Sequence, residues 1–236
     1  VTVSPEIFKK DVTATTTEVG RPFEPNVIGW NDTGIELAGS TPEATLRANW
    51  VGADPAGNDF GNTGHGILLR GANNFVGGID PSHANVVGHN GEDGIHVDAS
   101  CWSNEIQGNF IGTNALGADL GNGDDGVEIA GADETTVGEY VGIGVGLNPA
   151  KGNHIAFNAD IGVHVGSGFQ NAVRGNRFGS NGALAVDLGA PGVEVNDYLD
   201  EDSGANWRQN SPELDAGHTA YCLLYTSDAA DDETSG

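Results

Sequence analysis

Positive charge is scarce in this sequence of 236 residues, which contains 9 Lys and Arg against 34 Asp and Glu. The formal net charge is −25 at pH 7. Because proteins bind duplex nucleic acid by neutralising its phosphates with Lys and Arg, we expect no nucleic-acid partner. Attachment to an anionic membrane surface is disfavoured for the same reason.

Long apolar runs are also missing. No stretch approaches 18 consecutive apolar residues, so we expect no insertion into a membrane. The chain contains no Met, and Val1 does not open a charged and then apolar leader. We therefore expect a signal peptide to be absent or already removed.

The two cysteines do not indicate a disulfide framework. The stretch that begins at Cys222 resembles a translated sequencing adaptor of the kind found at the ends of metagenomic fragments. This resemblance implies that residues 222–236 are not natural protein and that flanking domains of a larger chain are missing. Cys101 would then be the single genuine cysteine, and one thiol does not identify a redox compartment.

Glycine, in contrast, is abundant, with 38 residues, but it falls too irregularly for the three-residue period of collagen. A hydrophobic share of 37% is sufficient for a packed core. Six short segments align on a small residue followed by apolar–x–apolar, and the first five lie 32, 28, 32 and 36 residues apart. The six segments begin at Gly34, Gly66, Gly94, Gly126, Gly162 and Ala185.

Within each segment the residues alternate with the period of two that is typical of a β-strand. Strands this short cannot bury an apolar face alone, whereas stacked turns pair their backbones and form ladders of Ile, Val and Leu. Two further columns of short apolar segments follow, for example at residues 104–106 and 153–155. The pattern therefore predicts an all-β protein, a parallel β-helix of about six turns with three short strands per turn.

Odd and even turns differ, because long excursions at residues 51–62 and 111–122 recur on turns one and three. The predicted repeat unit is therefore two turns. Asn tolerates the left-handed backbone of a tight corner, and its amide can bond the equivalent residue one turn away. We therefore expect corner ladders of asparagine, with a binding role as the alternative. The recurring asparagines are Asn49, Asn109 and Asn176 on odd turns and Asn90 and Asn158 on even turns.

Three phrases resemble the right-handed parallel β-helix repeats of large secreted or surface-attached bacterial proteins, within the wider pectin-lyase-like group. They are residues 104–117, 121–131 and 153–158. The resemblance implies a right-handed helix over residues 26–190, a lead-in or cap at 1–25 and an acidic closing segment at 191–221. It also implies an extracellular or cell-surface location. The fold hosts enzymes, adhesins and binding modules alike, so it does not define the function.

The central residue of each apolar–x–apolar segment should point outward, because side chains alternate across a strand. With turns about 4.8 Å apart, these residues predict an outer row of carboxylates and imidazoles. Such a row could supply a catalytic acid and base, or hold a metal between His96, Glu128 and His164. The alternative is an ordinary polar outer face. The row consists of Glu36, Leu68, His96, Glu128, His164 and Asp187, of which His96, Glu128, His164 and Asp187 are the catalytic candidates.

Further carboxylates precede the glycine in successive turns, at Asp93, Asp124, Asp125 and Asp160. Carboxylates one turn apart repel unless a cation shares them, and Ca²⁺ suits such oxygen-rich turns. A sharper calcium pattern follows the helix. We expect its loop to bind Ca²⁺, with a solvated acidic loop as the alternative. The predicted ligands are Asn196, Asp197, Asp200, Asp202 and Asn206.

Known enzyme patterns fit poorly. The motifs at residues 64–66 and 124–125 resemble Gly-His-Gly and Asp-Asp of polygalacturonase-like glycosidases, but they occur in the reverse order and no Arg-x-Lys follows. A pectate-lyase-like reaction would need a basic residue beside calcium-binding carboxylates, and Arg174 and Arg177 are the candidates.

Other substrate-binding candidates are Glu36 of the outer row and two tryptophans, Trp50 and Trp102. Aromatic rings could stack on pyranose rings, whereas the alternative is a structural role at the corners of the solenoid. The leading hypothesis is an extracellular bacterial domain that binds an extended polysaccharide or cell-surface glycan, or acts in adhesion. The alternatives are a polysaccharide lyase or glycoside hydrolase that uses the outer row, and a structural stalk.

Overall fold

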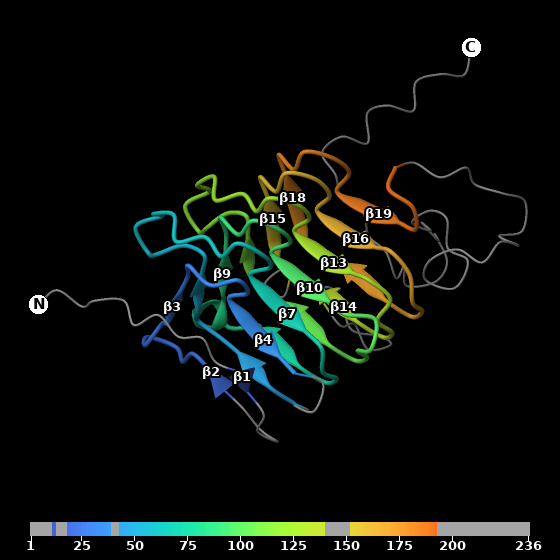
Figure 1. Ribbon diagram of the computed structural model, residues 1–236, viewed down its shortest axis with the longest axis horizontal. Helices are drawn as coiled ribbons and strands as arrows, with labels where there is room; N and C mark the ends of the chain where they lie inside the picture. Colours follow the sequence, from blue (N-terminus) through green and yellow to red (C-terminus); the bar gives the residue numbers. More distant parts are fainter. Residues whose placement is uncertain (1–10, 13–17, 39–42, 140–151, 193–236) are drawn as a thin grey trace, which may run out of the picture.

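Successive strands of the chain belong to three different sheets, and every third strand returns to the same sheet (Figure 1). This computed structural model describes residues 11–12, 18–38, 43–139 and 152–192. One sheet has seven strands and the other two have six each. Neighbouring strands within each sheet run parallel, as the pairs β10–β13, β11–β14 and β12–β15 show. The chain therefore forms a parallel β-helix, and the predicted fold class is confirmed.

The first sheet faces the viewer in Figure 1. It contains β1 (Asp11–Val12), β4 (Ile35–Leu37), β7 (Ile67–Leu69), β10 (Ile95–Val97), β13 (Val127–Ile129), β16 (Val163–Val165) and β19 (Val186–Leu188). The segments that were predicted from the repeat are the last six of these strands.

The other two sheets complete the six turns. The second sheet contains β2 (Glu18–Val19), β5 (Thr45–Leu46), β8 (Phe75–Gly77), β11 (Glu105–Gln107), β14 (Thr136–Gly138) and β17 (Ala172–Arg174). The third sheet contains β3 (Val27–Ile28), β6 (Trp50–Val51), β9 (Val86–Val87), β12 (Phe110–Ile111), β15 (His154–Ala156) and β18 (Arg177–Gly179). A short 3₁₀ helix, η1 (Pro81–His83), precedes β9.

The helix begins earlier along the chain than the predicted boundary at residue 26. Strand β1 pairs with β4, and β2 pairs with β5, so both belong to the first turn. The predicted closing segment at 191–221 lies outside the described residues except for its first two positions, and the predicted tail at 222–236 lies wholly outside them. No helix in the described part of the chain has the length and apolar character of a membrane span.

Alternation along each strand builds the core. In β10, Ile95 and Val97 are fully buried, whereas His96 between them is half-buried and faces outward. Ile95 lies in register with Ile67 and Val127 of the adjacent turns. Each inward apolar side chain therefore stacks on its equivalents and forms a continuous ladder along the helix axis.

Two asparagine ladders run along the corners on either side of the third sheet. In each ladder the side-chain amide donates to the amide oxygen of the next turn, at 2.7–3.3 Å. The structural role predicted for the asparagines is confirmed. The first ladder is Asn26, Asn49, Asn85, Asn109, Asn153 and Asn176, and the second is Asn31, Asn62, Asn90, Asn122, Asn158 and Asn181.

The predicted separation of these asparagines into odd and even turns is wrong, because each ladder has a member on every turn. Among the described residues, the feature that alternates between odd and even turns is the pair of long excursions. In both, a backbone bond closes the loop, from Phe60 to Gly52 at 2.9 Å and from Leu120 to Gly112 at 3.0 Å. The two-turn repeat therefore describes the loops rather than the helix that carries them.

Candidate functional site

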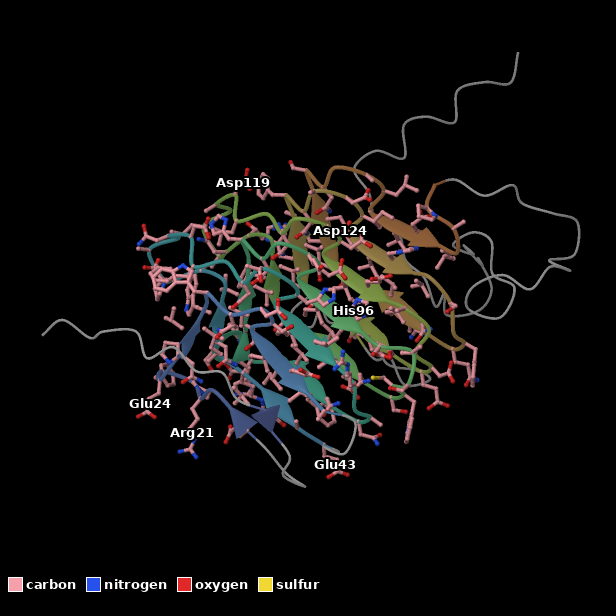
Figure 2. All side chains as sticks on the ribbon, viewed as in Figure 1. Arg21, Glu24, Glu43, His96, Asp119 and Asp124 are labelled. Atoms are coloured by element: carbon pink, nitrogen blue, oxygen red, sulfur yellow. The ribbon has the colours of Figure 1, made fainter. Side chains whose placement is uncertain are left out.

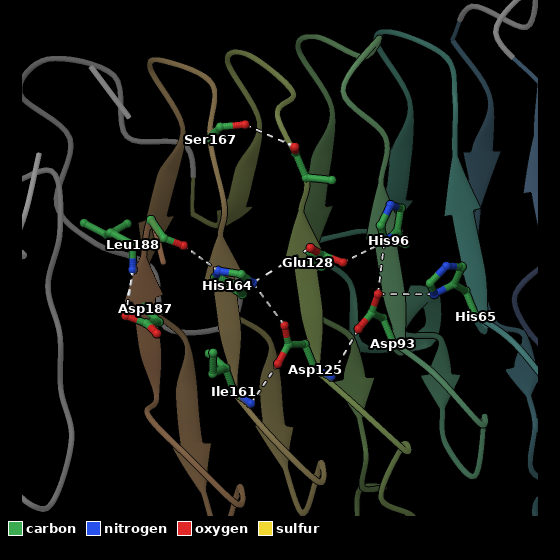
Figure 3. A network of polar contacts seen from close by, with 12 residues as sticks. His65, Asp93, His96, Asp125, Glu128, Ile161, His164, Ser167, Asp187 and Leu188 are labelled. Carbon is green, nitrogen blue, oxygen red and sulfur yellow. Dashed lines mark hydrogen bonds and ion pairs between the residues drawn. The ribbon is translucent and has the colours of Figure 1, made fainter. Parts of the chain in front are cut away.

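The predicted outer row lies in register across the first sheet. Glu36 lies opposite Leu68 on the neighbouring strand, and each later member of the row lies opposite the next in the same way, as far as Asp187. Figure 3 shows His96, Glu128 and His164 side by side on one face, and Figure 2 shows His96 near the middle of that face. The side chains of these three residues are 17%, 26% and 12% exposed, so solvent reaches Glu128 most easily.

Glu128 lies between the two imidazoles of the row. Its Oε2 atom is 3.0 Å from Nδ1 of His96, and its Oε1 atom is 3.8 Å from Nδ1 of His164. The two rings therefore face different oxygens of one carboxylate. The structure does not bring His96, Glu128 and His164 to the common point that the predicted metal site would need.

A second carboxylate contacts each imidazole, from the corner just before β10 for His96 and from the corner just before β13, one turn earlier, for His164. Oδ2 of Asp93 lies 3.0 Å from Nδ1 of His96, and Oδ2 of Asp125 lies 3.4 Å from Nδ1 of His164. The His164 ring also contacts the carbonyl of Gly189 through Nε2, at 2.9 Å. Each histidine of the row is thus held by two acidic side chains.

The aspartates beside the row do not simply repel one another, as the sequence suggested. The backbone N–H of Asp125 donates to Oδ1 of Asp93 at 3.1 Å, and the backbone N–H of Ile161 donates to Oδ1 of Asp125 at 2.8 Å. Asp93 and Asp125 are therefore a carboxylate version of the asparagine ladders. One oxygen of each carboxylate bonds the next turn, and the other faces a histidine.

These contacts set the protonation of the site. Burial would raise the pKa of Asp93, but its close contacts with His65 and His96 outweigh burial and hold that pKa far below the usual value. Burial would lower the pKa of His96, whereas Asp93 and Glu128 raise it to about 9. The bond to Asp125 likewise raises the pKa of His164 to about 9. Both rings of the row are therefore protonated at neutral pH.

His65 joins the site from the corner before β7, although the sequence pattern predicted no role for it. Its Nδ1 atom lies 3.2 Å from Oδ2 of Asp93, and its Nε2 atom lies 3.2 Å from Oε2 of Glu92. The His65 ring stacks on the His96 ring, with 4.4 Å between centroids and 28° between planes. The signals in the sequence were the Gly-His-Gly motif at residues 64–66 and the place of His65 directly before the repeat glycine, one turn ahead of Asp93.

The two ends of the row differ from its centre. Glu36 pairs with Arg70, whose Nε atom also lies 3.4 Å from Oδ2 of Asp98. Asp187 is buried, and its carboxylate accepts the backbone N–H groups of Leu188 and Gly192 at 3.0 and 2.7 Å. Asp187 is therefore in register with the row, but its carboxylate forms hydrogen bonds with the backbone at and after the end of β19.

The remaining substrate-binding candidates lie away from the row. Trp50 is in β6 and Arg177 in β18, both on the third sheet, and Arg174 is a buried residue of β17 on the second sheet. Trp102 is 54% exposed and forms an isolated bridge with Asp133. The structure does not gather these residues into one site with Glu36, and neither arginine lies on the sheet that carries the row. The predicted calcium loop, at Asn196, Asp197, Asp200, Asp202 and Asn206, lies outside the described residues.

Comparison with known proteins identifies no family for this chain. No protein-family model, no curated protein and no solved structure matches it. The strand order and register of this chain are therefore what identify it as a parallel β-helix.

Proposed function

We propose that this protein is an extracellular or cell-surface bacterial domain of the pectin-lyase-like type, and that it binds an extended polysaccharide along the first sheet. The observation that carries the proposal is the in-register row from Glu36 to Asp187. Successive members lie one strand apart, about 4.8 Å. A linear glycan laid across the strands would meet the polar side chains of Glu36, His96, Glu128 and His164, with the apolar Leu68 between the first two.

The more exposed groups of this face suit sugar hydroxyls. The side chains of Glu36, Arg70 and Glu128 are 32%, 48% and 26% exposed. Hydrogen bonds to charged groups are stronger than bonds between neutral groups, so they can hold hydroxyls in competition with water. The net charge of −25 favours a neutral or cationic glycan over an anionic one.

Protonation of the two imidazoles disfavours them as general bases. A general base at neutral pH must be unprotonated, whereas the pKa values of His96 and His164 are both raised to about 9. Asp187 bonds to backbone rather than facing the row. A lyase or glycoside hydrolase remains the alternative function, and it predicts product release rather than retention alone.

The test is a panel of neutral, cationic and anionic polysaccharides, assayed for retention of the whole chain and for released sugar. Each assay is run with CaCl₂ and with EDTA, which also tests the calcium prediction. We expect retention without release on at least one neutral or cationic glycan. Release of oligosaccharide would establish the enzyme instead, and retention on no glycan would leave the structural stalk.

Matched variants locate the binding face. Glu128→Gln removes a charged acceptor from the first sheet, and we expect it to weaken binding about tenfold. Glu105→Gln makes the same change on β11 of the second sheet, where Glu105 accepts a bond from Gln107. This control should bind within about twofold of the natural chain. Equal losses in both variants would contradict the proposed face.

A further inference from the structure

Three potential metal ligands converge at the edge of the row. Suitable ligand atoms of His65, Asp93 and His96 all lie within 4.8 Å of one another. Both Nδ1 atoms face the same oxygen, Oδ2 of Asp93, at 3.2 Å for His65 and 3.0 Å for His96. His65 belongs to the turn before Asp93 and His96, so only the stacking of turns brings the two imidazoles together.

The Nδ1 atom of His65 is buried and has no hydrogen-bond partner among the residues that the structure describes. It is close to Asp93, but the direction of approach does not form a hydrogen bond. A buried polar atom without a partner is costly, and its presence calls for a physical reason. A lone pair directed at a shared cation would supply that reason.

The surroundings of His65 and Asp93 match the outer contacts of known metal sites. Metal-binding histidines usually donate their second ring N–H to a carboxylate or carbonyl. Nε2 of His65 lies 3.2 Å from Oε2 of Glu92, and this contact favours a ring whose Nδ1 is free to bind. Asp93 is 3% exposed, and the backbone N–H of Asp125 holds its Oδ1, which leaves Oδ2 directed at both rings.

Negative charge surrounds the same point. Carboxylate oxygens of Asp93, Asp124 and Asp125 all lie within 4.8 Å of one another. Carboxylates this close repel one another when they are ionised. A divalent cation at Asp93 would relieve that repulsion.

The ligand chemistry selects among cations. Ca²⁺ and Mg²⁺ take oxygen ligands, whereas imidazole nitrogen suits Zn²⁺ and other divalent transition metals. Zinc sites with two histidines and one carboxylate leave a coordination position open for water or a substrate. We propose that His65, Asp93 and His96 form a binding site for a divalent transition-metal ion, with Zn²⁺ as the ion that the ligands fit best, and that binding releases the proton of the His96 ring to solvent. The site does not depend on the proposed polysaccharide binding.

The first test is calorimetric titration of ZnCl₂ into the whole chain and into three variants. His65→Gln and His96→Gln each remove one ligand, and loss of an outer partner alone typically weakens metal binding 10–100-fold. We therefore expect each variant to lose at least about 100-fold in zinc affinity. His164→Gln is the matched control, because His164 also lies between two carboxylates but no second imidazole is stacked on it. Zinc affinity within about twofold of the natural chain in His65→Gln would overturn the site.

The second test uses the natural chain, so it holds even if a variant fails to fold. Long-range ¹H–¹⁵N spectra of the histidine rings should show zinc shifting the Nδ1 signals of His65 and His96 while His164 stays in place. Equimolar CaCl₂ should leave both signals unchanged. Zinc that shifts neither ring, or binds only elsewhere, would overturn the proposal. Glycan retention is measured separately, so its failure would not imitate loss of the metal site.

Discussion

The backbone N–H of Asp125 donates to the carboxylate of Asp93, one turn away, at 3.1 Å. One oxygen of Asp93 thus joins two turns of the helix, and the other lies against His65 and His96. A side chain that is only 3% exposed therefore has a structural and an electrostatic role at once.

Replacing Asp93 separates these roles. Asp93→Ala leaves a buried N–H without its acceptor and removes the carboxylate that faces two imidazoles, so we expect a loss of about 3–5 kcal/mol in the free energy of unfolding. Asp93→Asn keeps an amide oxygen for Asp125 but removes the charge, so its loss should be smaller. Urea denaturation followed by circular dichroism measures both.

The control for Asp93 is Asp119→Ala. Asp119 also accepts a backbone N–H, from Gly121 at 3.1 Å, but it lies on an exposed loop. Its loss should stay below about 1 kcal/mol. Equal destabilisation by Asp93→Asn and Asp93→Ala would show that the bond to Asp125 contributes nothing.

Because Asn109 lies within an asparagine ladder, we expect its replacement to lower the free energy of unfolding strongly. Its amide donates to the carbonyl of Val76 at 2.9 Å and to Oδ1 of Asn153 at 3.0 Å. Its oxygen accepts the backbone N–H and one side-chain N–H of Asn85. Asn109→Ala leaves several of these buried groups without partners, so we expect a loss of about 2–4 kcal/mol. The midpoint of urea unfolding measures it.

Asn58→Ala is the matched change outside the ladders. Asn58 donates to Asp54 on an exposed loop at 2.8 Å, and its loss should be below about 1 kcal/mol. If Asn58→Ala lowers the urea midpoint as much as Asn109→Ala does, the ladders are not a principal source of stability.

Substitutions at two glycines of one loop separate the cost of a positive φ from the cost of a steric contact between turns. Gly112 and Gly117 both have positive φ, +72° and +75°. A Cβ at Gly112 would lie 2.0 Å from the carbonyl of Ala156, whereas one at Gly117 would meet nothing within 4 Å. We expect Gly117→Ala to cost about 1–2 kcal/mol from the backbone alone, and Gly112→Ala to cost about 3 kcal/mol or more. Thermal unfolding of both variants measures the difference, and similar costs would contradict the close approach of the turns.

Alkaline pH should weaken the fold through His164. Its pKa is raised from 6.5 to about 9 in the folded chain, so its stabilising contribution is complete below pH 6.5 and is lost as the pH rises through 9. The full contribution is at most about 3 kcal/mol. Urea unfolding at pH 6, 7.5 and 9.5 should show a decline that is smaller in His164→Gln. An equal decline in this variant would assign the pH dependence to other groups.

Local pattern was sufficient for the architecture. The period of two in segments such as Ile95–Val97 specifies which side chains enter the core, and asparagines at the corners specify where each turn bends. Parallel stacking repeats these local choices in register, so the pairing of His96 with Glu128 follows from their equal places in the repeat.

The site could not be predicted to the same extent, because its contacts cross between turns at positions outside the strands. His65 and Asp93 occupy equal places, each directly before the repeat glycine, but their residue types differ, and the repeat does not specify that the Asp93 carboxylate faces the imidazoles of both His65 and His96. Asp187 is a different case. Its repeat position places it in register with the row, but its carboxylate accepts the backbone N–H of Gly192.

By itself the sequence determined an acidic all-β solenoid with an outer row of histidines and carboxylates, because strand periodicity and corner residues are local properties. Only the tertiary structure decided that Asp93 unites His65 with His96 and that Arg174 and Arg177 lie on other sheets. The physical reason is that contacts between turns depend on the path of each corner, and the repeat pattern does not specify that path.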